Sequence, residues 1–148
     1  MKKDYTYIVL ADDDEDDRML FTDALAEMKI SAKVDTFKNG AELMNYLLLP
    51  EETIPEILFL DLNMPKKGGL ECLEEIRKNK KFQNMAVAIY STSSSEEHIE
   101  ETFVKGANVY IKKPNNFEEL KKVLSQVVTM NWQFDTLGMS KENFLLRL

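Results

Sequence analysis

Residues 57–61 read Ile-Leu-Phe-Leu-Asp, four apolar residues followed directly by a carboxylate. A short apolar run of this kind predicts a strand that is buried on both faces. Four other stretches are rich in strand-forming residues and are predicted as strands: 7–11, 32–37, 86–90 and 109–111. We therefore expect a five-stranded sheet with a carboxylate at the end of its third strand.

Helical patterns alternate with these predicted strands. Apolar residues recur at helical spacing within residues 20–28, 43–48, 70–76, 99–104 and 117–127. Five strand–helix units in alternation predict an α/β protein with a doubly wound parallel sheet and helices on both faces. Residues 32–37 alternate in polarity and end without a chemistry-bearing group, so we expect them at an edge of the sheet.

Composition limits the classes of function. The 148 residues fit one domain, and the net charge of −7 argues against a surface for nucleic acid or an anionic membrane. A single cysteine, Cys72, excludes an internal disulfide and a cysteine-rich zinc site, and we expect it to pack in the core. The single histidine, His98, is expected to be solvated at a helix start. We find neither an apolar run long enough to cross a membrane nor a signal peptide, so we expect a cytoplasmic protein.

Residues with useful chemistry follow four of the predicted strands: Asp12 and Asp13, Asp61, Ser91, and Lys113. The carboxyl ends of parallel strands meet at one edge of an open sheet, so we expect these side chains to converge. Three carboxylates together need a cation, and hard oxygen ligands favour Mg²⁺ or Mn²⁺. Beside such a metal, Asp61 is a candidate nucleophile toward a phosphoryl group, with Lys113 and Ser91 holding its oxygens.

The acidic run of residues 12–17 has two other interpretations. It is also typical of the acidic first turn of a helix, and for residues 14–17 we expect that role. An EF-hand loop counted from Asp12 fails, because its sixth position is Asp17 where glycine is required and its twelfth is Asp23 where glutamate is expected. Read alone, Asp61 is also typical of a turn and Lys113 of a solvated lysine.

Four motifs, in this order, resemble those of a response regulator receiver domain: Ile8-Val9-Leu10-Ala11-Asp12-Asp13, Leu60-Asp61-Leu62-Asn63-Met64-Pro65, Ile89-Tyr90-Ser91-Thr92 and Tyr110-Ile111-Lys112-Lys113-Pro114. The resemblance covers residues 5–130. Residues 62–67 and 91–97 further resemble a subfamily of stand-alone receivers that includes partners of cyanobacterial phytochromes. The resemblance implies a flavodoxin-like (βα)5 fold with strand order 2-1-3-4-5.

The resemblance also implies a phosphorylation site. Asp61 would accept a phosphoryl group from a sensor histidine kinase or a phosphotransfer protein, and Lys113 would bind that group. Asp12, Asp13, Asp61 and the backbone carbonyl of Asn63 would hold Mg²⁺, or Mn²⁺. Asp13 would bind the metal directly and Asp12 partly through water.

A switch is implied by the same family pattern. Ser91 would be the switch hydroxyl and Tyr110 the switch aromatic, which moves inward when the hydroxyl is drawn to the phosphoryl group. Tyr90 is bulky for its position, and we expect it to crowd that aromatic. The bond between Lys113 and Pro114 would be cis.

The resulting prediction is a switch in two-component signalling that catalyses only its own phosphotransfer and dephosphorylation. Two alternatives stay open. One is a Mg²⁺-dependent phosphatase with an aspartate nucleophile, which Asn63 disfavours because an amide cannot serve as its general acid. The other is a phosphorylation-independent adaptor on the same fold.

Residues 131–148 form a C-terminal extension that is too short for a separate output domain. Their apolar side chains predict docking, and Ser140 can cap a short helix that runs through Leu146. We expect the extension to dock either on its own domain or in a homodimer formed across the fourth and fifth helices. In both cases the signal is expected to leave through protein contacts.

Overall fold

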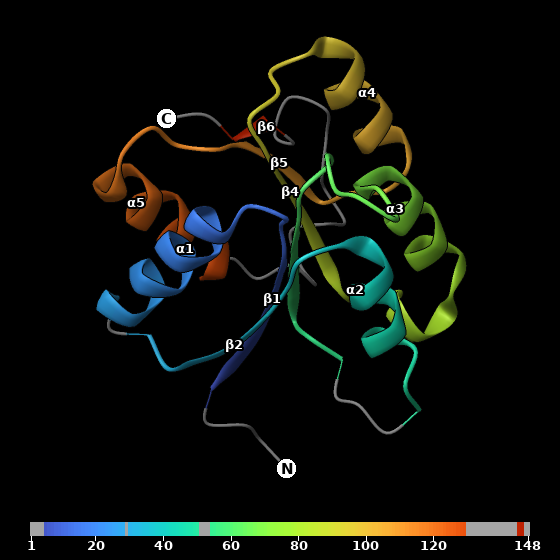
Figure 1. Cartoon of the computed structure of the whole chain (residues 1–148), viewed down its shortest axis with the longest axis horizontal. Helices are drawn as coiled ribbons and strands as arrows, with labels where there is room; N and C mark the ends of the chain where they lie inside the picture. The colour runs from blue at the N-terminus through green and yellow to red at the C-terminus, as the bar shows by residue number, and fades with distance from the viewer. Residues whose placement is uncertain (1–4, 29, 51–53, 130–144, 147–148) are drawn as a thin grey trace.

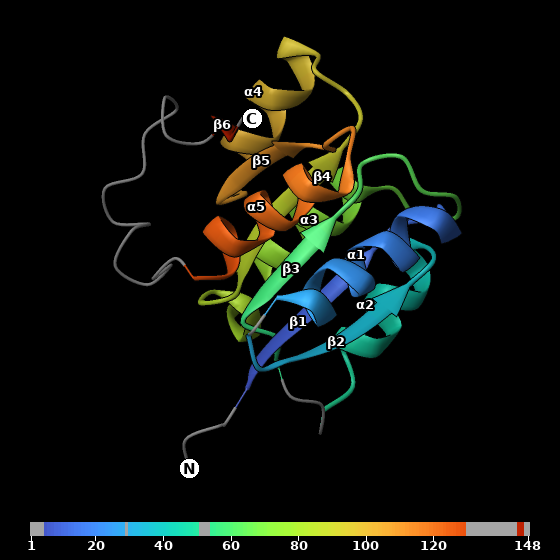
Figure 2. The ribbon, with the colours of Figure 1, turned by 90° about the vertical axis from the view of Figure 1, so that its left-hand side faces the viewer.

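The computed structural model contains one parallel sheet with helices on both faces (Figures 1 and 2). The structure describes residues 5–28, 30–50, 54–129 and 145–146. Its strands are β1 (Thr6–Ala11), β2 (Ala32–Phe37), β3 (Ile57–Leu60), β4 (Ala86–Ser91), β5 (Val109–Lys112) and β6 (Leu145–Leu146). Its helices are α1 (Glu15–Glu27), α2 (Gly40–Leu47), α3 (Gly69–Lys78), the short 3₁₀ helix η1 (Lys80–Phe82), α4 (Glu96–Val104) and α5 (Phe117–Val128).

Strand order within the described residues is β2-β1-β3-β4-β5-β6. The predicted α/β class and the order 2-1-3-4-5 of the first five strands are confirmed, and β2 lies at the edge as expected. The order reverses between β1 and β3, because β2 lies on the far side of β1. In doubly wound sheets, a site lies beyond the carboxyl ends of the strands at such a reversal.

The two faces of the sheet carry separate hydrophobic cores. Successive side chains of a strand point to opposite faces, so Val9 packs with Leu43 and Leu73 of α2 and α3. Leu10 points the other way and packs with Phe21 of α1 and Leu124 of α5. Figure 1 shows α1 and α5 together on one side, with α2, α3 and α4 on the other. Each strand end is thereby held between two packed layers.

Short polar side chains cap four of the five α-helices that the structure describes. Asp14 accepts a hydrogen bond from the backbone N–H of Asp17 at the start of α1, which confirms the capping role expected there. Asn39, Ser95 and Asn116 cap α2, α4 and α5 in the same way. These caps fix where each loop ends, beyond the carboxyl end of the preceding strand.

The C-terminal extension differs from its prediction. Leu145 and Leu146 form a strand that runs parallel to β5 and pairs with Tyr110 and Ile111, so the expected helix does not run through Leu146. The free backbone groups of an edge strand favour pairing with another strand over an isolated helical turn. The rest of the extension, residues 131–144 and 147–148, lies outside the described residues.

Two composition-based expectations can be checked directly. Cys72 is fully buried, as expected. Among the described residues, no helix combines the length and apolar character that a membrane crossing needs.

Candidate functional site

Four strands place polar side chains at one edge of the sheet. Asp12 follows β1, Asp61 follows β3, Ser91 ends β4 and Lys113 follows β5. Backbone bonds fix their positions: the N–H of Asp61 donates to the carbonyl of Ala11 at 3.0 Å, and that of Lys113 donates to the carbonyl of Ser91 at 2.8 Å. Asp12 and Ser91 are fully buried and Asp61 is 5% exposed. The structure brings together the residues that the strand-end pattern predicted, while their roles stay predictions.

Lys113 is surrounded by carboxylates. Its Nζ lies 2.8 Å from Oδ2 of Asp12 and 3.3 Å from Oδ2 of Asp61. A third carboxylate, that of Asp17 on α1, also lies 2.8 Å from Nζ. Burial alone lowers the pKa of Lys113, but its bonds to Asp12 and Asp17 outweigh burial, so the pKa lies above its usual value. The ammonium group therefore stays charged at neutral pH.

Asp12, Asp13 and Asp61 form a group in which one oxygen of each lies within 4.8 Å of the others. Burial raises the pKa of Asp61 to about 6 against the opposing charge of Lys113, and the Asp12 carboxylate adds to the rise. Asp13 is exposed, so the group opens to solvent on its side. A divalent cation entering there would relieve the repulsion that raises the pKa of Asp61.

The loop after Asp61 packs closely against its backbone. The N–H of Asn63 donates to Oδ1 of Asp61 at 3.4 Å, and the N–H of Gly69 donates to the carbonyl of Leu62 at 3.0 Å. A Cβ atom on Gly69 would lie 2.3 Å from the carbonyl oxygen of Asp61, closer than any side chain tolerates. Glycine is therefore required at this position if α3 is to begin directly beside Asp61.

Comparison with known proteins identifies the family. Residues 8–125 match the response regulator receiver domain. The chain belongs to the response regulator receiver domain family. It is accordingly a receiver domain of two-component signalling, as its motifs predicted.

Relatives include phytochrome response regulators. The chain is 28% identical over 124 residues to the response regulator Rcp1 of Synechocystis sp., an alignment covering 81% of this chain and 84% of Rcp1. It is 27% identical over 123 residues to the probable methanogenesis regulatory protein FilR2 of Methanothrix harundinacea, covering 81% of this chain and 79% of that protein.

Solved structures agree with these relatives. The Mn²⁺-bound form of Rcp1 superposes with a TM-score of 0.78 at 26% identity, covering 84% of this chain and 96% of that chain. The phosphorylated cyanobacterial phytochrome response regulator RcpA has a TM-score of 0.77 at 31% identity, covering 83% of this chain and 91% of that chain. The similarity to this subfamily is thus confirmed.

Receiver domains bind a divalent metal ion, and the donor set of this chain fits one. Three carboxylates offer hard oxygen ligands, and a single ammonium group faces them. Asp12, Asp13 and Asp61 are the residues that would hold the ion. Asn63 lies two residues beyond Asp61, where the resemblance places its carbonyl as a further ligand.

Ser91 connects to a hydrogen-bonded loop that leads to α4. Its Oγ accepts from the N–H of Ser93 at 3.1 Å, and the carbonyl of Ser93 accepts from the hydroxyl of Tyr110 at 2.9 Å. Oγ of Ser93 lies 2.8 Å from Nδ1 of His98 on α4. The expectation that His98 is merely solvated is wrong, because it is half-buried and bonded to this loop.

The two tyrosines near Ser91 do not crowd each other, contrary to expectation. Tyr90 packs on the α1 and α5 face beside Phe21, whereas Tyr110 belongs to the core on the opposite face. The cause is strand alternation: Tyr110 is in register with Ile89, the neighbour of Tyr90. Tyr110 is fully buried in the structure, and its movement on phosphorylation stays a prediction.

The bond between Lys113 and Pro114 is trans, since none of the described peptide bonds is cis. The implied cis bond is therefore wrong for this structure. Trans is the form that bonds before proline ordinarily favour.

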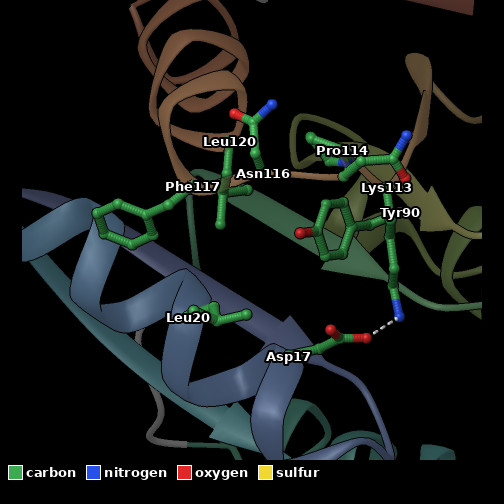
Figure 3. Close-up of a pocket in the computed structure, with 9 residues that line it drawn as sticks. Asp17, Leu20, Tyr90, Lys113, Pro114, Asn116, Phe117 and Leu120 are labelled. Carbon is green, nitrogen blue, oxygen red and sulfur yellow. Dashed lines mark hydrogen bonds and ion pairs between the residues drawn. The ribbon is translucent and has the colours of Figure 1, made fainter.

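Asp17 is a site residue that sequence reasoning missed. We assigned it to the helix start, yet its carboxylate reaches Lys113, 96 positions away in the chain. Figure 3 shows the two side chains beside a cavity, which has a volume of about 120 Å³ and is lined by Tyr90 of β4 and by residues of α1 and α5, among them Phe117. No local pattern distinguishes Asp17 from its acidic neighbours. Asp17 lies one helical turn after Asp13, which places it near the strand end. This spacing identifies Asp17 as a site residue only once the position of Lys113 is known.

Proposed function

We propose that this receiver domain is a phosphorylation switch whose Asp61 accepts a phosphoryl group from a sensor histidine kinase or a phosphotransfer protein. One observation carries the proposal: a buried carboxylate lies 3.3 Å from the ammonium group of Lys113 and within metal-sharing distance of Asp12 and Asp13. A nucleophile flanked by fixed positive charge suits the transfer of an anionic group.

Side chains of the protein carry out most steps of the proposed phosphoryl transfer. An oxygen of Asp61 attacks phosphorus, the bond from phosphorus to the donor nitrogen breaks, and the donor histidine keeps that electron pair. Lys113 donates to the phosphoryl oxygens, and the hydroxyl of Ser91 turns toward them. Mg²⁺, when bound by Asp12, Asp13 and Asp61, neutralises charge on the phosphoryl oxygens. We propose that the protein acts only on its own phosphoryl group and is otherwise not an enzyme.

The proposed output is protein contact. The loop from Ser91 through Ser93 to His98 links the site to the start of α4. We propose that phosphorylation changes the face formed by α4 and α5, where a partner or a second copy of the chain binds. A cytoplasmic location follows from the proposed kinase partner.

Intact mass measured after treatment with a small phosphodonor tests the proposal. We expect one added phosphoryl group with Mg²⁺, none with chelator, and none in Asp61→Asn, which keeps the shape of the side chain but removes the nucleophile. A group of the same lability on Asp61→Asn would contradict the assignment. Turnover of a phosphate monoester by the wild-type protein would favour the phosphatase alternative instead.

A further inference from the structure

The ammonium group of Lys113 forms ion pairs with three carboxylates. Asp12, Asp17 and Asp61 each place an oxygen 2.8–3.3 Å from Nζ, and Nζ donates hydrogen bonds to Asp17 and Asp61. The side chain of Lys113 is only 9% exposed, so water cannot easily complete or exchange these contacts. The longest of the three distances is the one to Asp61.

Asp17 differs from the other two partners in position and exposure. Its side chain is 31% exposed, whereas that of Asp12 is 0% and that of Asp61 is 7% exposed. It comes from the first turn of α1, and it is not one of the three carboxylates grouped closely enough to share a metal ion. Figure 3 shows its side chain extending from α1 to the ammonium group of Lys113. Asp17 therefore restrains the lysine without belonging to the metal site.

Phosphorylation increases the negative charge that Lys113 faces. The carboxylate of Asp61 carries one negative charge, and the acyl phosphate that replaces it carries about two, both on the terminal phosphoryl oxygens. Lys113 then has a new oxygen to bind, while three carboxylates already compete for its single positive charge. Of its three partners, Asp17 is the one that water can solvate when it is released. The charge of Asp17 also repels the added phosphoryl charge.

We propose that Asp17 is a positioning residue that holds Lys113 away from the phosphoryl group and so limits how tightly the site retains that group. This inference rests on the proposed function. The ion pair between Asp17 and Lys113 must break when Asp61 is phosphorylated. The strength of this ion pair sets part of the free-energy cost of binding the phosphoryl group. At an effective dielectric between those of water and a protein surface, a unit charge about 6 Å away opposes a second charge by roughly 1.4 kcal/mol, which corresponds to about 10-fold in binding.

Binding of beryllofluoride, a stable analogue of the phosphoryl group, measures this cost. We would titrate the full chain at saturating Mg²⁺ and record the dissociation constant by ¹⁹F NMR. Asp17→Asn should bind about 10-fold more tightly than wild type, and Asp17→Glu, which keeps the charge, should stay within about 3-fold of wild type. Asp16→Asn is the matched control, because it removes the same charge from an exposed side chain in the same turn of α1. It should change the dissociation constant less than 2-fold, on the order of a screened surface charge.

The outcomes are distinct. Equal affinities for Asp17→Asn and Asp16→Asn would overturn the inference, because net charge alone would then explain the effect. Tighter binding by both Asp17→Asn and Asp17→Glu would also overturn it, since altered packing would be the cause. If the wild-type protein bound no beryllofluoride and gained no phosphoryl group at Asp61, the proposed function itself would fail.

Discussion

Asp61 is a buried carboxylate whose folded environment disfavours its charge. Its pKa is raised to about 6, mainly by burial, with Asp12 adding to the rise and Lys113 opposing it. The folded protein therefore binds a proton at Asp61 more tightly than the unfolded chain does. The stability that this proton contributes is fully present below the ordinary pKa of 3.8 and is lost as the pH rises toward about 6.

Replacing this carboxylate should stabilise the metal-free protein at neutral pH. We expect Asp61→Asn to exceed wild type by about 1–3 kcal/mol at pH 7.5 in chelator, because each unit of pKa shift corresponds to roughly 1.4 kcal/mol. The difference should shrink toward zero near pH 4, where Asp61 is protonated. Urea denaturation across this pH range measures it, and a difference that does not vary with pH would contradict the raised pKa.

Asp13 and Asp14 are adjacent acids with different expected roles. One oxygen of Asp13 lies in the group with Asp12 and Asp61, whereas Asp14 caps α1 through its bond to the N–H of Asp17. Asp13→Asn should weaken Mg²⁺ binding by about 10-fold or more, on the scale of other changes to metal sites. It should also stabilise the metal-free protein by relieving repulsion.

Asp14→Asn is the matched control for this metal prediction. It removes the same charge, and asparagine caps a helix as well as aspartate does. Calorimetric titration with Mg²⁺ compares the two variants. Identical affinities would mean that the acidic run acts only as a helix start.

At the scale of elements, the loop between β4 and α4 joins the site to the helix that follows. Ser93 makes three hydrogen bonds that hold this loop. The N–H of Ser93 donates to Oγ of Ser91, its carbonyl accepts from the hydroxyl of Tyr110, and its hydroxyl is bonded to Nδ1 of His98. We expect the bond from the N–H of Ser93 to weaken when the hydroxyl of Ser91 turns toward a phosphoryl group. A shift of Ser93 would then be transmitted to both Tyr110 and α4 through these bonds.

His98 reports this change, since it is the single histidine of the chain. We expect its imidazole ¹⁵N resonances to shift when beryllofluoride binds with Mg²⁺. Ser93→Ala should bind the analogue but lose most of that shift, whereas Ser94→Ala, a change at the neighbouring exposed serine, should keep it. An unchanged shift in Ser93→Ala would show that α4 is coupled to the site by another route.

At the scale of the whole molecule, the sheet has two edges of different kinds. β2 forms one edge, and the far side of β5 is paired with β6 from the end of the chain. An uncovered edge strand is open to pairing with another chain. The C-terminal strand therefore protects β5, whose residue Tyr110 belongs to the proposed switch.

Truncation after Thr129 should destabilise the protein. We expect a loss of about 1–2 kcal/mol, the scale of two or so backbone hydrogen bonds, measured by urea denaturation at low protein concentration. Unchanged stability would contradict a role for β6 pairing within one chain. Sedimentation of both forms, with and without beryllofluoride, tests the predicted homodimer, and weaker self-association of the truncated form would place the extension in its interface.

The sequence by itself determined the alternation of strands and helices and the identity of most site residues. Apolar runs identify buried strands, and in a parallel sheet every strand end lies at the same edge, so Asp12, Asp61, Ser91 and Lys113 could be brought together from their positions in the chain. Family motifs then supplied the roles.

The tertiary structure alone decided which of these groups touch and what else joins them. The distance from Lys113 to each carboxylate depends on how α1 packs against the sheet, and no pattern in residues 12–17 separates Asp17 from its neighbours. The pairing of Leu145–Leu146 with β5 is likewise nonlocal, because it depends on a free strand edge that the local sequence does not encode. Local patterns fix the direction and burial of a side chain, whereas contacts between distant segments follow from how the layers pack.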